Sequence, residues 1–537
     1  MATQAQPRRR KFWGWGYEDQ QPPPAEVEAA AKGIVAHLGF GASEVESPPR
    51  VEDLELAPSR LDPPASLTEI CAADPHSRAS HALGKAYRDV VRAFRGRIEH
   101  PPDVVATPRT EQELGQALDW CAGVGAAAVP YGGGTSVVGG VEPRFDGPAV
   151  SIDLGKLTGV HEVDSASLAA RIGAGTLGPV LEDELREHDL TLRHYPQSFE
   201  LSTLGGWVAT RAGGHFATGP THIDDLVESV RALTPQGVWE SRRLPGSGAG
   251  PSPDRLLIGS EGILGVITEA WVRVRPRPVF KASASLGFAG FQAGAQAVRA
   301  LAQSGLEPAN CRLLDPGEAG LTGAGDGEQA VLVLGFESAD HPLGPWLDRG
   351  LELCRGHGGT PLGEPRLTGP GDESRRDGSA GAWRSAFLQA PYLRDTMVAA
   401  GVLSETFETA ITWDRSDAFV AEVRERAEQA VARECGEGRV SCRLTHAYPD
   451  GAAPYFTVLA PARRGSEVEQ WDAVKAAVTE TLIAAGGTVT HHHAVGRDHR
   501  PGGYDVQRPE PFAEALRAAK RAVDPQAILN PGVLIDP

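Results

Sequence analysis

Three consecutive histidines, His491, His492 and His493, stand near the C-terminal end of the sequence, and His499 follows them. Histidine titrates near neutral pH, so such a cluster suits either proton transfer or metal binding. In an extended segment alternate side chains point to opposite faces, so three adjacent histidines cannot all bind one ion without ligands from elsewhere. The triplet therefore predicts a proton-transfer site. Ordinary surface and buried histidines without a chemical role are the alternative.

Three glycine-rich stretches indicate a binding site for a diphosphate. The first reads PYGGGTSVVGG, over 130–140, and its consecutive glycines leave backbone amides free to face an anion. It matches neither G-x-G-x-x-G nor the P-loop, and a flexible loop is the alternative for this stretch alone. The others read YPQSFELSTLGGWVATRAGG, over 195–214, and GSEGILGVITEA, over 259–270. Each alone is an ordinary turn signal, but their order and spacing together point to one site.

An α/β unit is expected to carry the first of these stretches. The apolar run DVVATP, over 103–108, is typical of a strand. Thr110 as N-cap and Glu113 in a capping-box position predict a helix that ends at the glycines of GVG, over 123–125. A second apolar run, AAAVP, leads directly into the glycines. Further short strands are predicted at 149–154, 168–175, 227–240 and 265–278.

A second alternation of strands and helices begins after 278, and an amphipathic helix followed by a Pro/Asn/Gly turn forms the tail. The pattern predicts an α+β second domain. The expected organisation is an N-terminal helical extension over 1–97, a binding domain over 98–278, a cap or substrate domain over 279–489, and a C-terminal segment over 490–537 that packs back near the site.

Charge and composition exclude several function classes. The 537 residues carry a net charge of -18, which disfavours a nucleic-acid partner because phosphate binding needs a basic surface. Six cysteines without a CxxC pair indicate reduced thiols. No apolar run has the length of a membrane span, and the basic start lacks an apolar signal region. We expect a cytoplasmic protein, with peripheral membrane contact as a further possibility.

The three glycine-rich stretches together resemble the FAD-binding domain of the vanillyl-alcohol oxidase/p-cresol methylhydroxylase superfamily of flavoproteins. This implies an α+β fold with a two-subdomain FAD-binding domain, an α+β cap domain and a C-terminal helical return. A narrower resemblance, to the alkyldihydroxyacetonephosphate synthase family, is carried by KFWGWGYED (11–19), CRLLD (311–315), SETFETAITWDR (404–415), PYFTV (454–458) and THHHAVGRD (490–498).

The resemblance implies FAD, held non-covalently because the glycine loop has no histidine or cysteine for a covalent link. In the family the first loop holds the FAD diphosphate, and the other two surround the flavin and its ribityl chain. The implied cofactor-binding residues are Pro130, Tyr131, Gly132, Gly133, Gly134, Thr135, Ser136, Val137, Gln197, Ser198, Glu200, Ser202, Thr203, Gly206, Thr210, Arg211, Ala212, Gly213, Glu261, Gly262, Leu264, Gly265, Val266 and Ile267.

The implied reaction exchanges the acyl group of an acyl-dihydroxyacetone phosphate for a fatty alcohol without net redox change. A base removes a C1 proton, flavin N5 bonds to that carbon as the carboxylate leaves, and the alcohol then replaces the flavin. Tyr455 matches the family's proton donor/acceptor, assisted by His491, His492 and His493. Two arginines are implied as well, Arg394 for the substrate phosphate and Arg312 near the flavin. The partners would be lipid substrates, and a homodimer is a further expectation.

Departures from the family pattern keep an alternative open, an FAD-linked oxidase or dehydrogenase of a hydroxy acid or alcohol. Gln197 stands where the family usually has Asp, and Gly213 replaces the serine of TRAS. The related metal-dependent branch uses H-x-G-D-G-N-x-H and Glu-His-Gly. Here His446 stands in a similar place, but Tyr455 and His491 replace two expected ligands, so no metal is expected.

Overall fold

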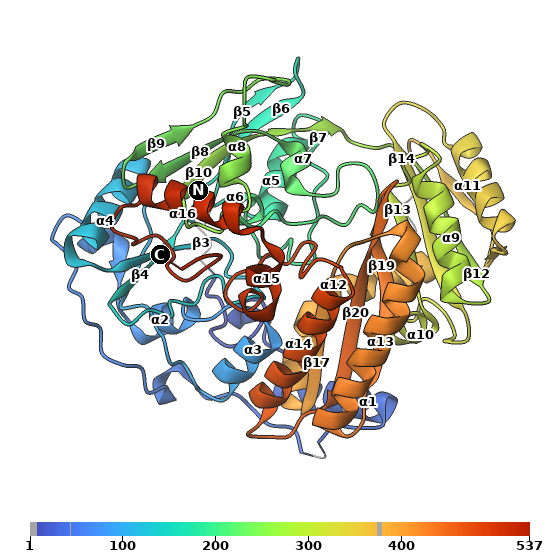
Figure 1. The fold of residues 1–537 in the computed structure, drawn as a ribbon, viewed down its shortest axis with the longest axis horizontal. Coiled ribbons are helices and arrows are strands. Elements are labelled where there is room, and N and C mark those ends of the chain that lie inside the picture. Colours follow the sequence, from blue (N-terminus) through green and yellow to red (C-terminus); the bar gives the residue numbers. More distant parts are fainter. Residues whose placement is uncertain (1–7, 43, 373–377, 537) are drawn as a thin grey trace.

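The computed structural model describes residues 8–42, 44–372 and 378–536. Figure 1 shows most of the N-terminal half on the left, with helix α1 (Pro24–Leu38) at the lower right, the strands and helices of residues 280–484 on the right, and the C-terminal helix α16 returning to the left side. No helix in these ranges is both long and apolar enough to cross a lipid bilayer. The domain boundaries predicted from the sequence stay predictions.

A small sheet with the strand order β1-β2-β4-β3 carries the first glycine-rich loop. Strands β2, β4 and β3 are parallel, and β1 adds antiparallel. Thr110 caps α4 through a hydrogen bond from Glu113 N to its Oγ1 (3.1 Å), and Gly125 ends the helix with a positive φ, as predicted. The elements are β1 (Cys71–Ala72), α2 (Pro75–Ser80), α3 (Tyr87–Phe94), β2 (Val104–Ala106), α4 (Glu111–Val124), β3 (Ala127–Tyr131) and β4 (Ala149–Asp153).

An antiparallel sheet with the order β5-β6-β10-β8-β9 forms the second half of the binding part, beside the small pair β7–β11. Its inward positions are apolar and buried, while outward positions carry charges, the pattern of a sheet with one covered face. The elements are β5 (Val160–Asp164), β6 (Ala169–Gly173), α5 (Gly178–Arg186), β7 (Leu190–Thr191), α6 (Leu204–Thr210), α7 (Ile223–Leu226), β8 (Val227–Thr234), β9 (Gly237–Glu240), α8 (Asp254–Leu257), β10 (Val266–Arg273) and β11 (Arg275–Pro276).

A large antiparallel sheet, β15-β12-β14-β13-β19-β20-β17, forms the cap, with β16 paired to β12 and β18 to β20. Helices cover it, and α13 and α14 pack on each other. The elements are β12 (Phe280–Phe288), α9 (Phe291–Ala302), β13 (Asn310–Leu314), α10 (Pro316–Thr322), β14 (Ala330–Ser338), α11 (Gly344–Gly356), β15 (Thr360–Pro361), β16 (Arg366–Thr368), α12 (Gly378–Ala399), β17 (Val402–Glu408), β18 (Ile411–Thr412), α13 (Trp413–Cys435), β19 (Arg439–Ala447), β20 (Gly451–Pro461) and α14 (Glu467–Ala484).

Both ends of the described chain pack back onto the fold, the C-terminal end on the binding part and the N-terminal end mainly on the cap. After α15 (Asp505–Gln507) and α16 (Glu510–Val523), the C-terminal segment runs parallel to β3, where Ala128 N donates to Ile528 O and Asn530 N to Ala128 O. At the other end, α1 (Pro24–Leu38) packs on α12, and Phe12, Trp13 and Trp15 join the core beneath β17 and β20. The C-terminal return is thus as expected.

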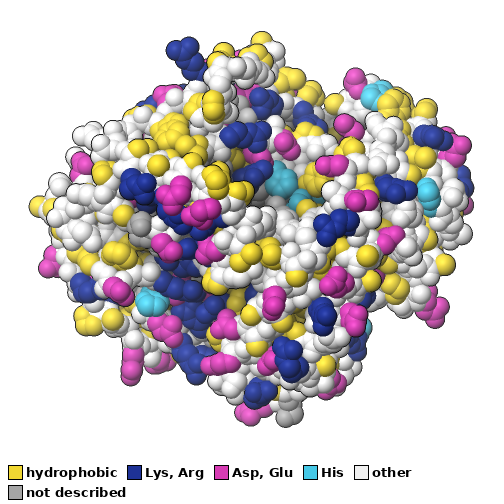
Figure 2. All heavy atoms as spheres, in the orientation of Figure 1, with side chains coloured by type: hydrophobic (Ala, Val, Ile, Leu, Met, Phe, Trp, Pro, Cys, Tyr) yellow, Lys and Arg dark blue, Asp and Glu magenta, His cyan; other side chains and the backbone are white. Residues whose placement is uncertain are grey.

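The negative net charge is spread unevenly. Figure 2 shows basic side chains gathered along a furrow on the face where α3 lies. The arginines on and just after α3 are neutralised by carboxylates, since Arg92 Nη2 lies 2.6 Å from Glu142 Oε1 and Arg95 pairs with Glu467. Paired charges of this kind give no free basic surface for a polyanion.

Candidate active site

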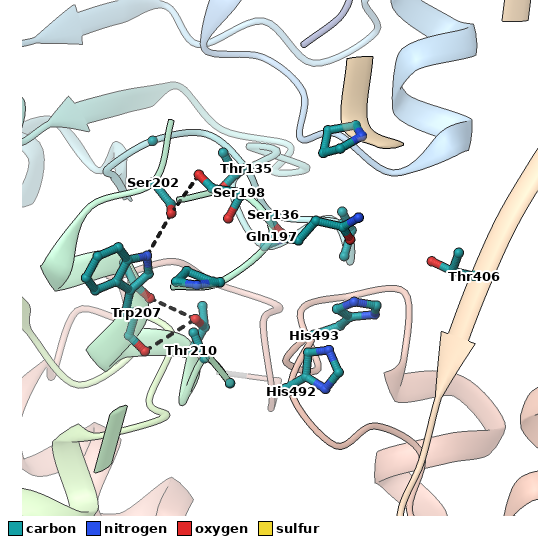
Figure 3. Close-up of a pocket in the computed structure, with 18 of the residues that line it drawn as sticks. Thr135, Ser136, Gln197, Ser198, Ser202, Trp207, Thr210, Thr406, His492 and His493 are labelled. Carbon is teal, nitrogen blue, oxygen red and sulfur yellow. Dashed lines mark hydrogen bonds between the residues drawn. The ribbon is translucent and has the colours of Figure 1, made fainter. Parts of the chain in front are cut away.

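A cavity of about 370 Å³ lies between the binding part and the cap. Figure 3 shows Thr135, Ser136 and Gln197 on one side and Thr406 of β17 on the other, with His492 and His493 on the C-terminal loop near the space between. The structure therefore brings together segments that are about 360 residues apart in the sequence, as the resemblance required.

The glycine-rich loop after β3 provides a row of backbone amides. No amide N–H of residues 132–137 donates a hydrogen bond to another described residue. The loop also runs against the 201–203 turn so closely that a Cβ on Gly133 would lie 2.0 Å from Leu201 O. Gly134 has a φ of +66°. Unpaired amides on a tight, glycine-dependent loop form an anion site of the kind a diphosphate needs, so the residues present fit FAD.

The second stretch forms a turn and the short helix α6. Thr203 caps this helix, accepting a hydrogen bond from Gly206 N at 3.3 Å. Ser202 Oγ accepts from the buried Trp207 Nε1 (2.7 Å) and donates to Ser198 O (2.9 Å), which fixes the turn against the core. Figure 3 shows these bonds on the binding side of the cavity.

The third stretch ties the C-terminal segment to the site. Glu261 is buried, and its carboxylate accepts hydrogen bonds from the amides of Val495 (2.9 Å) and Gly496 (2.8 Å). Burial raises the pKa of Glu261 to about 7, although these two hydrogen bonds oppose the shift. Asn530 Nδ2 donates to Glu261 O at 2.8 Å. The loop that follows the histidine triplet is therefore held directly on the cofactor-binding part.

One carboxylate, Glu408 at the end of β17, holds the histidine triplet. It accepts hydrogen bonds from the amides of His491, His492 (3.2 Å) and His493 (2.9 Å), and from Thr490 Oγ1 (2.5 Å). Burial by itself would raise the pKa of Glu408, but the surrounding histidine rings and donated hydrogen bonds hold it below its ordinary value. A buried carboxylate that is charged near neutral pH thus fixes the backbone of the triplet.

The histidines are neutral near pH 7. The pKa values of His446, His491 and His492 lie well below 6.5, because burial disfavours the charged form and the rings crowd one another. The triplet lies in a bend, and His491 Nδ1 is only 2.9 Å from His492 Nδ1. The assumption of alternate faces along a strand therefore does not hold for these two side chains, because the segment is a loop.

His446, His491 and His492 bring three ring nitrogens within 4.8 Å of one another, a grouping that could hold a metal ion. Ring nitrogens in this group already have protein partners. His446 Nε2 lies 3.0 Å from Gly214 O, and His491 Nε2 lies 2.8 Å from Tyr448 Oη. The expectation of no metal stays a prediction, with the hydrogen-bond network as its structural support.

Tyr455 lines the cavity from β20, directly across the sheet from Glu408. Its ring centroid lies 5.8 Å from that of His493 and 6.1 Å from that of His492. The guanidinium of Arg443 lies over the ring at 3.8 Å, and Arg443 in turn pairs with Glu318. The phenol hydroxyl forms no hydrogen bond with another described residue, so it is available to a bound reactant.

The two predicted arginines occupy different environments. Arg312 on β13 is fully buried, donates to His215 O at 3.0 Å and lies over the Trp383 ring at 4.1 Å. Burial, and then the charge of Arg443, lower the pKa of Arg312 to about 9. Arg394 on α12 lines the cavity, and its only described hydrogen bond goes to Lys85 O (3.1 Å). No described carboxylate pairs with Arg394, which leaves it available to an anion.

Most of the implied residues line the cavity, and five do not. Glu200 accepts from Tyr392 Oη at 2.7 Å, and Arg211 pairs with Asp224 at 3.0 Å. Leu264 and Val266 are buried in the cores behind the site. His491 lies behind His492 rather than at the cavity wall. The lining set is Pro130, Tyr131, Gly132, Gly133, Gly134, Thr135, Ser136, Val137, Gln197, Ser198, Ser202, Thr203, Gly206, Thr210, Ala212, Gly213, Glu261, Gly262, Gly265, Ile267, Arg312, Arg394, Tyr455, His492 and His493.

Reasoning from the sequence missed Glu408, Arg443 and Glu318 as parts of the site. Glu408 stands in SETFETAITWDR, where a carboxylate occupies an otherwise buried strand position. Arg443 in SCRLTHA shows the same signal. A charged residue inside an apolar strand must find a partner, so this pattern could have marked both.

Comparisons with known proteins agree with this geometry. Residues 102–241 match the model of the FAD binding domain, and residues 277–534 that of the FAD linked oxidases, C-terminal domain. The chain is 30% identical over 486 residues to alkyldihydroxyacetonephosphate synthase of Caenorhabditis elegans, covering 86% of this chain and 80% of the relative.

Solved structures show the same fold. An alkyldihydroxyacetonephosphate synthase structure superimposes with a TM-score of 0.79 at 23% identity, covering 97% of both chains. p-Cresol methylhydroxylase superimposes with a TM-score of 0.68 at 15% identity, covering 96% of this chain and 98% of that one. These matches confirm the predicted α+β architecture with FAD-binding and cap domains. The chain therefore belongs to the FAD-linked oxidase family, as a member similar to alkyldihydroxyacetonephosphate synthase, and it has the fold of p-cresol methylhydroxylase.

Proposed function

We propose that this FAD-dependent enzyme exchanges the acyl group of an acyl-dihydroxyacetone phosphate for a fatty alcohol, giving the ether and a free fatty acid. The proposal rests on one observation above all: Arg394, which pairs with no carboxylate among the described residues, shares a cavity with the neutral histidines and Tyr455. An anion-binding arginine beside neutral proton carriers suits a phosphate ester from which a proton must be removed.

The cavity wall between these groups suits a lipid chain. From α10, α12 and β20 it presents mainly apolar side chains, among them Leu321, Leu393, Met397 and Leu459. An apolar chain bound there would be removed from water, which stabilises the complex by roughly 25 cal/mol per Å² buried. An apolar wall leading to an arginine matches a molecule with a phosphate at one end and an acyl or alkyl chain at the other.

Proton transfer falls to Tyr455 and the histidines because the carboxylates that line the cavity are already engaged. Glu261 accepts the amides of Val495 and Gly496, and Glu318 pairs with Arg443. A phenol is a weak base at its ordinary pKa near 10, so His492 and His493 are expected to share the proton that Tyr455 receives. Bound FAD supplies the electrophilic ring near which this exchange takes place.

The test is ether formation by purified, flavin-loaded protein supplied with palmitoyl-dihydroxyacetone phosphate and hexadecanol, followed by mass spectrometry. We expect the alkyl product and palmitate in equal amounts. Tyr455→Phe should keep its flavin and lose turnover, while Tyr504→Phe, a tyrosine outside the cavity lining, should keep both. No ether, together with flavin bleaching by a hydroxy acid under nitrogen, would favour an FAD-linked oxidase or dehydrogenase instead.

A second experiment tests the phosphate assignment. Wild type should prefer palmitoyl-dihydroxyacetone phosphate over the same ester without phosphate, and Arg394→Met should lose most of that preference. Losing a charge-assisted pair to phosphate is expected to raise KM by about 10- to 100-fold. A preference for the phosphate ester that survives in Arg394→Met would rule out Arg394 as the phosphate ligand.

A further inference from the structure

The segment Arg8–Tyr17, which contains most of the KFWGWGYED motif, folds into a hairpin against the site. Arg10 and Tyr17 form an antiparallel bridge, and Lys11 N donates to Gly16 O at 3.1 Å. The aromatic residues of the hairpin are buried in a core shared with α3, β17 and β20. Trp15 is only 4% exposed, lines the cavity and keeps its Nε1 buried without a hydrogen-bond partner. The motif is therefore part of the wall of the site.

Arg10 holds the diphosphate-binding loop from behind. Its guanidinium donates hydrogen bonds to Gly133 O and to Leu201 O, the latter at 3.3 Å. In a trans peptide the C=O and N–H point in opposite directions, so a Gly133 carbonyl held by Arg10 turns the Gly134 N–H away from the hairpin. That amide belongs to the row that donates no hydrogen bond to another described residue. Arg10 thus fixes the orientation of one peptide in the anion site.

The opposite side of the hairpin holds helix α12. Trp15 N donates to both oxygens of Asp395, at 3.2 and 3.0 Å, and Lys11 Nζ lies 3.4 Å from Asp395 Oδ2. The approach is close enough to require glycine at 14, because a Cβ there would lie 2.2 Å from Asp395 Oδ2. Asp395 directly follows Arg394, so these contacts fix the helix turn that carries the unpaired arginine.

Cations gather where the hairpin meets the loop. Arg10, Lys11 and Lys85 line a small pocket together with Gly133 and Thr135. Lys85 Nζ has no hydrogen-bond or ion-pair partner among the described residues. Burial lowers the pKa of Lys85 to about 8. A group of cations directly behind a row of free amides increases the attraction of that loop for a diphosphate.

We propose that the hairpin positions two parts of the binding site. Arg10 is a positioning residue for the FAD diphosphate loop. Asp395, which binds Lys11 and Trp15 of the hairpin, is a positioning residue for Arg394. The first half concerns FAD alone. The second half rests on the proposed function, since it assigns Arg394 to a substrate phosphate.

FAD affinity tests the first half without any turnover. Apoprotein freed of flavin would be titrated with FAD by fluorescence, and its thermal unfolding measured in parallel. Arg10→Met should raise the FAD Kd by about 10- to 100-fold, the effect of losing charge-assisted hydrogen bonds. Arg8→Met is the matched control, because Arg8 sits on the same hairpin but, within the described part of the chain, pairs with the exposed Asp19 and with Tyr17 and not with the glycine loop. Both apoproteins should unfold at similar temperatures.

Wild-type FAD affinity in Arg10→Met would overturn the assignment. If that variant does not fold, Arg10→Lys decides, since lysine keeps the charge but cannot reach both carbonyls. Its FAD Kd should exceed that of wild type, and equality would refute the role of Arg10.

The second half is tested by binding of palmitoyl-dihydroxyacetone phosphate, followed through the flavin absorbance of the loaded enzyme. Asp395→Asn should weaken this binding about tenfold and leave the FAD Kd unchanged, while Asp19→Asn should change neither. If Asp395→Asn binds the phosphate ester as wild type does, the hairpin does not position Arg394. If neither enzyme binds the ester, the proposed function fails, and the FAD titration still decides the role of Arg10.

Discussion

Glu408→Gln tests whether Glu408 positions the histidine triplet for turnover or only stabilises the fold around it. The carboxylate receives hydrogen bonds from Thr490 Oγ1 and from three consecutive amides, and its side chain is fully buried. Glutamine has nearly the same shape, but its NH₂ group would face N–H donors where Glu408 presents an oxygen. The change therefore removes the charge and leaves a buried donor without an acceptor, with little change in volume.

The magnitude follows from the hydrogen bonds. Leaving one buried donor unsatisfied costs about 1–3 kcal/mol, and each remaining bond to a neutral oxygen is weaker than a bond to the carboxylate by about 1 kcal/mol. With two or three bonds weakened, the backbone of the triplet should be destabilised by about 3–6 kcal/mol. The loop is held elsewhere by Glu261, so we expect local displacement of the histidines rather than global unfolding.

The assay compares kcat, flavin content and urea unfolding for Glu408→Gln and for Glu405→Gln. Glu405 lies on the same strand and is also buried, but its hydrogen bonds go to Lys475 (2.8 Å) and Trp471 rather than to the triplet, and its charge raises the pKa of His493. We expect kcat to fall at least about 100-fold in Glu408→Gln, as for other losses of a positioned acid–base group, and to change little in Glu405→Gln. Both should lose stability and keep FAD.

Equal kcat in the two variants would refute the reasoning, because it would show that any buried carboxylate on β17 contributes only to stability. The pH dependence gives a second check. The pKa of Glu408 is lowered in the folded state, so its stabilising contribution is complete above the ordinary pKa near 4.5 and is lost as the pH falls below it. Wild type and Glu408→Gln should therefore converge in stability only in acid.

Other expectations can be tested separately. Gly133→Ala should abolish FAD retention, because its Cβ would meet Leu201 O at 2.0 Å, whereas Gly123→Ala in α4 has free space and should be neutral. Dialysis against a chelator should leave turnover unchanged, and stoichiometric zinc or manganese in the protein would contradict this. Acid precipitation should release all the flavin, and yellow colour remaining in the pellet would indicate a covalent link. Between about pH 7 and pH 5, His446 takes up a proton in the unfolded state but stays neutral in the folded state. The free energy of unfolding of wild type should therefore fall more steeply over this range than that of His446→Gln.

Local sequence signals predicted the binding part well. The capping pair around α4 and the glycine loop after β3 follow from backbone chemistry that acts within a few residues. The order of the three glycine-rich stretches then carried the family resemblance. Gly132 and Gly133 are needed because the 201–203 turn packs on them, whereas Gly134 has a positive φ and lies against the Tyr131 side chain.

The conformation of the histidine triplet could not be predicted from neighbouring residues alone. A strand would place the three side chains on alternate faces. In the structure three successive amides donate to the carboxylate of Glu408, and the segment is therefore bent. The cause lies about 83 residues away in the sequence. A charged residue inside an apolar strand indicates that the buried charge has a hydrogen-bonding partner, but the sequence does not show which segment of the chain supplies that partner.

Nearby positive charges disfavour a metal ion in this cluster, which supports the proposal that the histidines transfer protons. The positive charges of Arg312 and Arg443 help to depress the pKa values of His446 and His492, respectively, in addition to burial and the neighbouring rings. The same field opposes a divalent cation at those nitrogens more strongly than it opposes a single proton, since the repulsion scales with charge. Glu408 opposes this field at His491 and His493, since its charge raises their pKa values, although burial still leaves both pKa values below 6.5. We therefore expect the imidazoles to accept a proton more readily when a bound substrate anion offsets the charge of the arginines.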